Sequence, residues 1–216
     1  TKYCLKMDIR KFYPNINHKI LKELLRRKVK DKDVLWLIDM IIDSIDGNKG
    51  IAIGSLLSQW MGNFYLTYFD HWLKENKHIK YYYRYCDDLV ILSDDKDFLH
   101  QIRKEIQQYL LNNLDLELKN NWQVFPTKVR GIDFVGYRYF VDYILLRKST
   151  AKNMKKKLKK IYKRCKRGIS LTYSEWCSIN SYNGRLKWCN GYHLYLKYIK
   201  PLEFYVNKYY MEEIKK

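Results

Sequence analysis

The chain has 216 residues, of which 47% are hydrophobic and 16% aromatic, and its net charge is +19. This length allows one large domain or two small ones, and so basic a surface is expected to attract nucleic acid. A lysine bias of the genome is the alternative explanation of the charge. The odd number of cysteines and the absence of Cys-x-x-Cys argue against a disulfide framework. Without a signal peptide or a long apolar run, we expect a cytoplasmic protein that makes no membrane contact.

The first third of the chain predicts one strand followed by helices. Residues 3–9 predict a strand with Asp8 at its C-terminal end, and Pro14 cannot continue that strand. Two helices are expected next, N-capped by Asn17 and Asp31, because apolar residues recur there at helical spacing.

The middle of the chain contains the pattern with the most chemical interest. After a glycine-bounded piece at 50–54, a long and buried apolar helix is expected over about 55–75. Residues 81–92 then predict a tight β-hairpin, with Asp87 and Asp88 at its turn. Adjacent carboxylates repel, and a divalent cation would relieve the repulsion. Because aspartate is a common turn former, an ordinary surface turn is the alternative.

The remaining elements place a domain boundary near residue 147. A helix is expected from Asp94-Asp95, and further strands at 114–118, 122–126, 131–140 (with Gly136 inside it) and 143–146. The later part reads as helical throughout: a basic amphipathic helix from about residue 150, a helix capped by Thr172–Glu175, and a last helix from about Tyr192. We therefore expect an α+β domain over 1–147 and a helical domain over 148–216.

Four segments resemble the sequence blocks of reverse transcriptases, in the order in which that family carries them. Tyr85-Cys86-Asp87-Asp88 resembles the Tyr-x-Asp-Asp box, and Lys6–Ile16 resembles the first catalytic block. Gly50–Trp60 is similar to the template-and-nucleotide block, and Ile132–Tyr137 to the primer-grip hairpin. The resemblance covers roughly 3–140, and four ordered blocks are far more specific than any one of them.

The resemblance implies both a fold and an activity. The fold is α+β: a polymerase palm, built as an antiparallel sheet with packed helices around a ferredoxin-like or RRM-like core, with part of the fingers, followed by an all-helical thumb. The activity is RNA-directed DNA polymerisation with two Mg²⁺ ions (Mn²⁺ as an alternative), a template RNA, a DNA primer and dNTPs. Family members carry a fingers segment before the first block, so we expect this chain to be a fragment, a split gene product or part of a longer chain.

The resemblance also implies roles at the catalytic centre. Asp8 and Asp87, with the carbonyl of Ile9, would be the metal ligands, and Asp88 the less essential acid. The implied nucleotide-binding residues are Arg10 and Lys11 near the triphosphate, Tyr13 under the sugar, Gln59 by the templating base pair, and Lys119. Lys119 and Lys128 are both candidates for the lysine that protonates pyrophosphate.

Further implied roles concern the primer and the duplex. The implied primer grip consists of Phe134, Val135, Gly136 and Tyr137. The basic helix would lie along a template–primer duplex through Lys155, Lys156, Lys159, Lys160, Lys163 and Arg164. The alternative for these residues is a solvated lysine face.

Several functions remain open within and outside the family. Ser58-Gln59 and the tail segment Ser181–Asn190 look most like the enzymes of bacterial and phage diversity-generating retroelements, which work with a small basic accessory protein. Group II intron, retron and phage-defence enzymes are the near alternatives. Another alternative is a nucleic-acid-binding module that catalyses no reaction. A third is an RNA-templated RNA polymerase, which the bulky Tyr13 disfavours.

Overall fold

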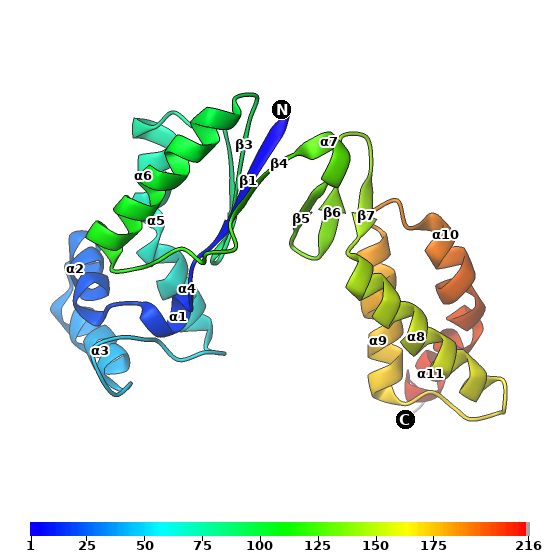
Figure 1. Cartoon of the computed structure of the whole chain (residues 1–216). Coiled ribbons are helices and arrows are strands. Elements are labelled where there is room, and N and C mark those ends of the chain that lie inside the picture. The colour runs from blue at the N-terminus through cyan, green and yellow to red at the C-terminus, as the bar shows by residue number, and fades with distance from the viewer. Residues whose placement is uncertain (215–216) are drawn as a thin grey trace. The chain divides into compact units, whose positions relative to one another are not determined.

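The computed structural model describes residues 1–214, which fall into two compact units that divide between Pro126 and Thr127 (Figure 1). Each unit has a hydrophobic core of its own. The division comes earlier than the expected boundary at 147, because the small sheet before that point packs into the core of the second unit. Tyr137 and Leu146 from that sheet both belong to the second core.

An antiparallel sheet of four strands, in the order β2-β3-β1-β4, organises the first unit. Its strands are β1 (Tyr3–Asp8), β2 (Tyr81–Tyr85), β3 (Asp88–Ser93) and β4 (Gln123–Pro126). The predicted strands at 3–9 and 122–126 and the predicted hairpin at 81–92 are confirmed. The predicted strand at 114–118 is wrong, because the chain turns at Asp115 (φ 52°) and only Leu118 forms a bridge, to Ile9.

Helices of the first unit begin where the sequence places caps. The Asn17 side chain accepts a hydrogen bond from the Ile20 amide, and the Asp31 side chain accepts two at the start of the next helix. The predicted helix over 55–75 is divided, with a break at Leu66 and a final π-helical turn. The helices are α1 (Phe12–Asn15), α2 (His18–Lys28), α3 (Lys32–Asp43), α4 (Leu56–Tyr65), α5 (Thr67–His71), η1 (Trp72–Asn76) and α6 (Lys96–Leu114).

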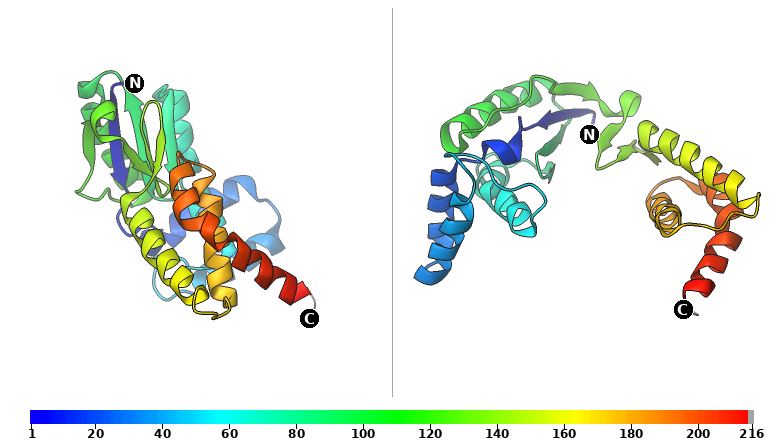
Figure 2. Two further views of the ribbon diagram at one scale, coloured as in Figure 1. Left: turned by 90° about the vertical axis from the view of Figure 1, so that its right-hand side faces the viewer. Right: turned by 90° about the horizontal axis from the view of Figure 1, so that it is seen from below.

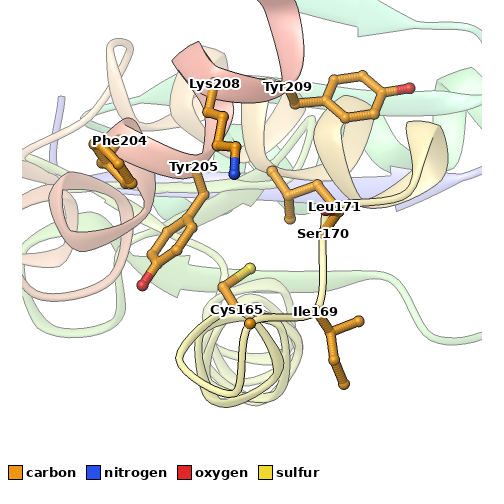
Figure 3. A pocket seen from close by; sticks show the side chains of 9 residues that line it. Cys165, Ile169, Ser170, Leu171, Phe204, Tyr205, Lys208 and Tyr209 are labelled. Carbon is orange, nitrogen blue, oxygen red and sulfur yellow. The ribbon is translucent and has the colours of Figure 1, made fainter. Parts of the chain in front are cut away.

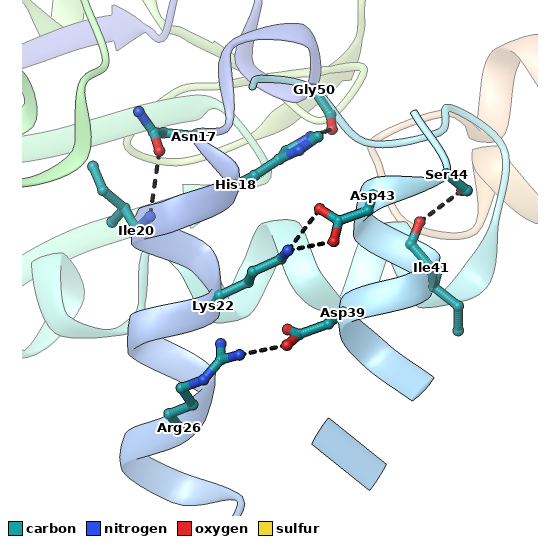
Figure 4. A network of polar contacts seen from close by, with 10 residues as sticks. All are labelled: Asn17, His18, Ile20, Lys22, Arg26, Asp39, Ile41, Asp43, Ser44 and Gly50. Carbon is teal, nitrogen blue, oxygen red and sulfur yellow. Dashed lines mark hydrogen bonds and ion pairs between the residues drawn. The ribbon is translucent and has the colours of Figure 1, made fainter. Parts of the chain in front are cut away.

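Ion pairs join α2 and α3 side by side (Figure 4). Lys22 Nζ donates to both carboxylate oxygens of Asp43 at 2.6 and 2.7 Å, and Arg26 pairs with Asp39. The buried His18 donates from Nε2 to the carbonyl of Gly50 at 2.6 Å, which ties the start of α2 to the loop before α4. The hairpin of α2 and α3 is thus fixed by polar contacts.

The two faces of the first sheet differ in chemistry. Cross-strand partners share a face, so Leu5 and Ile91 lie on one side, where α4, α5 and α6 cover them (Figures 1 and 2). The opposite face carries Asp8 beside Asp88, followed by the exposed rings of β2, which are Tyr81, Tyr83 and Tyr85. The sheet therefore presents acids and aromatic rings on the face that these helices leave uncovered.

The second unit combines a small sheet with a helical bundle. The range 131–140 is not one strand: Val135 and Gly136 both have positive φ (47° and 84°) and turn the chain between β5 and β6. The predicted final helix is likewise divided into short segments around Pro201. The elements are α7 (Thr127–Arg130), β5 (Ile132–Phe134), β6 (Tyr137–Tyr139), β7 (Ile144–Leu146), α8 (Lys148–Cys165), α9 (Tyr173–Leu186), α10 (Tyr192–Leu194), η2 (Tyr195–Ile199), η3 (Lys200–Leu202) and α11 (Glu203–Ile214).

Within residues 1–214, no helix has the length and apolar character that a membrane crossing requires.

The predicted capping box of α9 gives a stability test. Thr172 Oγ1 accepts from the Glu175 amide, and the Glu175 carboxylate accepts from the Thr172 amide. Thr172→Ala should lower the free energy of unfolding by about 1 kcal/mol, because helix N–H groups lose their acceptor. Chemical denaturation measures the loss. Ser149→Ala, in the first turn of α8, is the control and should change little; equal losses would contradict the role of the cap.

Candidate active site

Strand pairing brings the three predicted acids to one end of the first sheet. Asp8 is the last residue of β1 and lies directly opposite Asp88, the first residue of β3. The β2–β3 turn consists of Cys86 and Asp87, with Cys86 in the left-handed region (φ 51°). The Ile9 amide donates to the Asp87 carbonyl at 3.1 Å, which fixes this turn against the end of β1. The backbone therefore places Asp8, Asp87 and Asp88 together.

The site contains more negative charge than a half-buried position readily holds. Burial raises the pKa of Asp87, and the nearby charge of Asp8 raises it further, against the opposing effects of a backbone hydrogen bond and of the Lys119 charge. The Lys119 ammonium pairs with Asp8, and this bond raises the pKa of Lys119. Lys6 lies 3.8 Å from Asp88 on the same face. The two lysines thus partly neutralise three carboxylates.

These donors fit a hard divalent cation that takes its remaining ligands from a substrate. In the part of the chain that the structure describes, no three acidic, imidazole or thiol groups are arranged as a complete metal cage. Mg²⁺ needs no such cage, because it usually binds through one or two carboxylates together with phosphate and water oxygens. Asp8 and Asp87 supply two carboxylates whose mutual repulsion a cation would relieve.

A guanidinium that the sequence analysis missed holds the Cys86-Asp87 turn between β2 and β3. Arg84 Nη1 donates to the carbonyl of Cys86 at 3.2 Å, while Nε and Nη2 form a two-pronged ion pair with Asp70 of α5. Tyr82 donates to the same carboxylate at 2.7 Å. Bidentate pairs of this kind fix geometry as well as charge. The turn is therefore anchored to the helical layer beneath it.

The predicted nucleotide-binding residues are positioned separately around this end of the sheet. Tyr13 lies in α1, half-buried, with its hydroxyl 3.8 Å from Cys86 Sγ; burial and this contact raise its pKa to about 12. Arg10 is exposed and pairs with Glu117 at 3.4 Å. Lys11 is exposed and has a positive φ of 44°. Gln59 is exposed in the first turn of α4.

The predicted primer-grip residues form the tip of the β5–β6 hairpin in the second unit. Phe134 and Tyr137 pair across the turn made by Val135 and Gly136. The Gly136 carbonyl accepts from the Arg147 amide at 3.0 Å, and the Tyr137 hydroxyl donates to the Arg185 carbonyl at 3.1 Å. This hairpin is fixed to the helices of its own unit. Lys128, the other candidate acid, lies in α7 of this unit.

The six predicted basic residues of α8 are not equivalent. Arg164 donates to Glu175 at 2.5 Å, so its charge is used to hold the start of α9. Lys155 is half-buried, and Lys159 lies over the ring of Tyr198. The exposed members are Lys156, Lys159, Lys160 and Lys163.

A polar groove between α8 and α9 contains cations that the sequence analysis left out. It has a volume of about 340 Å³ and is lined by Lys157, Ser174, Cys177, Ser178, Ser181, Tyr182 and Arg185. Lys157 Nζ donates to Ser178 Oγ at 2.7 Å. Among residues 1–211, whose side chains the structure describes, neither Lys157 nor Arg185 has a carboxylate at ion-pair distance. The spacing 174, 178, 181, 185 is helical, so the sequence contained this signal.

A second, smaller cavity in this unit has the character of a packing defect and not of a binding site. It measures about 80 Å³ and lies between the end of α8 and α11, with Cys165 on one side and Tyr205, Lys208 and Tyr209 on the other (Figure 3). Burial raises the pKa of the Cys165 thiol. A thiol of this kind is unreactive, and its main contribution is packing.

A comparison with protein families identifies the class. The family model described as reverse transcriptase (RNA-dependent DNA polymerase) matches residues 1–139. The match includes β1, the β2–β3 hairpin and the three acids, and it extends over most of the chain. The chain belongs to the reverse transcriptase family. A comparison with curated proteins gives no match.

Solved structures support the same fold. Telomerase from Candida tropicalis, in complex with a fragment of telomeric RNA, is similar with a TM-score of 0.54 at 14% identity, over 74% of this chain and 33% of that one. The corresponding Candida albicans complex gives 0.53 at 13% identity, over 97% and 44%. The chain thus spans less than half of either telomerase chain. The α+β polymerase fold expected from the sequence is confirmed.

The raised pKa of Asp87 predicts a pH-dependent cost of stability. A carboxyl group whose pKa is higher in the folded state binds protons more tightly there, so the free energy of unfolding falls as pH rises from the ordinary value near 4 to the raised one. Asp87→Asn removes this cost and should raise the melting temperature at pH 7. The gain should disappear below about pH 4.

Thermal unfolding of both proteins across pH 3–8, without divalent cations, measures this difference. Asp46→Asn, in an exposed turn, is the control and should show no such pH dependence. An Asp87→Asn protein that is less stable than wild type at pH 7 would contradict the electrostatic argument.

Proposed function

We propose that the chain is the catalytic core of an RNA-directed DNA polymerase that adds deoxynucleotides to the 3′-hydroxyl of a primer on an RNA template. The observation that carries the proposal is the convergence of Asp8, Asp87 and Asp88 at one sheet end, within a chain of the reverse transcriptase family. The RNA named with both telomerase structures is in keeping with an RNA partner.

The residues of the site divide the proposed chemistry among them. Asp8, Asp87 and the carbonyl of Ile9 would hold two Mg²⁺ ions, which activate the primer hydroxyl and stabilise the leaving pyrophosphate when bound. Lys119 pairs with Asp8 in the structure. When a nucleotide binds, the Lys119 ammonium would leave Asp8 and pair with the triphosphate, where it could protonate the leaving pyrophosphate. Asp88 pairs with Lys6, so we expect it to contribute less to metal binding than Asp8 and Asp87 do.

The second unit would bind the duplex. The groove between α8 and α9 offers two cations and three serine hydroxyls, with no acid among its lining residues, a combination that suits the phosphates of a nucleic-acid strand. The exposed lysines of α8 add long-range attraction. The primer-grip role of Phe134–Tyr137 remains part of this proposal.

Primer extension tests the catalytic assignment. In the full-length protein with Mg²⁺, Asp87→Asn should lower kcat at least about 100-fold, because the transition state loses several kcal/mol of charge stabilisation. Asp8→Asn should behave alike, and Asp88→Asn should retain more activity. Asp46→Asn serves as the matched control.

Two results would contradict the catalytic assignment. One is wild-type extension by the Asp87→Asn protein. The other is a wild-type protein that binds primer–template without extending it at any Mg²⁺ concentration, which would favour the binding-module alternative. Preference for ribonucleotides would instead favour an RNA polymerase.

The groove makes a prediction that needs no catalysis. Lys157→Gln should weaken binding to an RNA–DNA duplex and reduce the slope of log K against log salt concentration by about 1, because one phosphate contact is lost. Fluorescence anisotropy at several salt concentrations measures the slope. Lys152→Gln, on the same helix but outside the groove, is the control. An unchanged slope for Lys157→Gln would remove the groove from the interface.

A finer assignment concerns the biological setting. We propose a bacterial or phage retroelement that makes cDNA for sequence diversification, with a small accessory protein as partner; the support is the Ser58-Gln59 variant and the tail segment Ser181–Asn190. Ser58 is buried and Gln59 exposed in α4. A neighbouring pair of near-identical repeats that differ at adenines would support this setting, and their absence would favour an intron, retron or defence enzyme.

A further inference from the structure

Gly62 packs against two aromatic rings in the first unit. It lies inside α4, and its φ is not in the left-handed region, so backbone conformation does not call for glycine. A Cβ atom at this position would lie 3.0 Å from Cε1 of Tyr13 and 3.2 Å from Cε1 of Phe12. Carbon atoms in favourable contact are about 3.5–4.0 Å apart. A methyl group on Gly62 would therefore fit only if one of these rings moved by a few tenths of an ångström.

The two rings differ in their freedom to move. Phe12 is 2% exposed and belongs to the first core, where close packing resists displacement. Tyr13 is only half-buried, and its hydroxyl contacts Cys86 in the turn between β2 and β3. A methyl group on Gly62 would consequently displace Tyr13 more than Phe12. The Tyr13 ring thus faces α4 at Gly62, and its hydroxyl contacts the Cys86-Asp87 turn.

We propose that Gly62 is a positioning residue that sets the place of the Tyr13 ring and, through it, the choice between deoxyribonucleotides and ribonucleotides. The inference rests on the proposed function, in which Tyr13 lies against the sugar of the incoming nucleotide. Exclusion of a single hydroxyl depends on a fit of tenths of an ångström, and small misplacements in a site have large kinetic effects. Gly62 acts without touching the nucleotide.

Nucleotide discrimination by the full-length protein tests the inference. The readout is kcat/KM for a dNTP divided by kcat/KM for the matching rNTP, in primer extension. Gly62→Ala should lower this ratio at least about fivefold, mainly through a lower KM for the rNTP, because the displaced ring no longer excludes the 2′-hydroxyl. Gly184→Ala is the matched control: it lies inside α9 with open space around its Cβ position and should leave the ratio unchanged.

A change at the second ring separates positioning from general damage to the core. Phe12→Leu alters the buried ring beside Gly62 and leaves the space around Tyr13 free of a new methyl group, so it should lower the ratio less than Gly62→Ala does. Should Gly62→Ala fail to fold, Cys86→Ala tests the contact on the other side of Tyr13 and should also lower the ratio.

The outcomes distinguish this inference from the proposed function. A wild-type protein that incorporates no dNTP defeats the proposed function itself. An active wild type in which Tyr13→Ala relaxes sugar choice, while Gly62→Ala folds and keeps the wild-type ratio, overturns only the role of Gly62. If Gly62→Ala is unfolded and Cys86→Ala keeps the ratio, the inference is likewise overturned.

Discussion

The fixed position of β1 is the constraint on which the first unit depends. The strand pairs with β3 on one edge and β4 on the other, so both of its edges are hydrogen-bonded. Beyond its end, the Asp8 carbonyl accepts from the Lys119 amide at 2.8 Å, and the Arg10 amide donates to the Glu117 carbonyl at 2.8 Å. A strand held on both sides cannot shift its register. Asp8 therefore meets the β2–β3 turn at one defined place.

This rigidity holds together groups that would otherwise separate. The carboxylates of Asp8 and Asp87 repel, and the backbone bond from Ile9 to Asp87 keeps them close. Functional sites commonly retain such unfavourable arrangements because the surrounding structure over-determines them. Lys119 reduces this repulsion without removing it, and Lys6 pairs with the third acid, Asp88.

Local signals made much of this arrangement predictable from sequence. Asn17, Asp31 and the Thr172–Glu175 box mark helix starts through the chemistry of their own side chains, and the structure has each cap in place. The turn at Asp87 follows from two β-prone runs separated by polar residues. The resemblance to the sequence blocks of a known family then predicted that segments far apart in the chain belong to one site.

What the sequence did not reveal depends on tertiary contact or on unusual backbone. Val135 is β-branched yet has a φ of 47°, so propensity alone favours a continuous strand where the chain turns. The pair of Asp70 and Arg84 joins a helix to a strand, and no local pattern announces it. Residues 114–118 alternate like a strand but have only an isolated bridge to pair with. The groove residues of α9, which end at Arg185, recur at helical spacing, and this spacing is visible in the sequence. The groove also needs α8 packed beside α9, and spacing alone does not predict that packing.

The alternation along β2 has a consequence for how the protein can change over time. Tyr83 and Tyr85 face outward, while Tyr82 and Arg84 face the helices and secure the turn. A single inserted or deleted residue would exchange these two sets, exposing the guanidinium and burying the outward rings. Heritable length changes in this strand are therefore tolerable only in steps of two, whereas substitutions on the outward face leave the anchoring set intact. Lineages can thus vary the surface of the hairpin freely while its length stays constant.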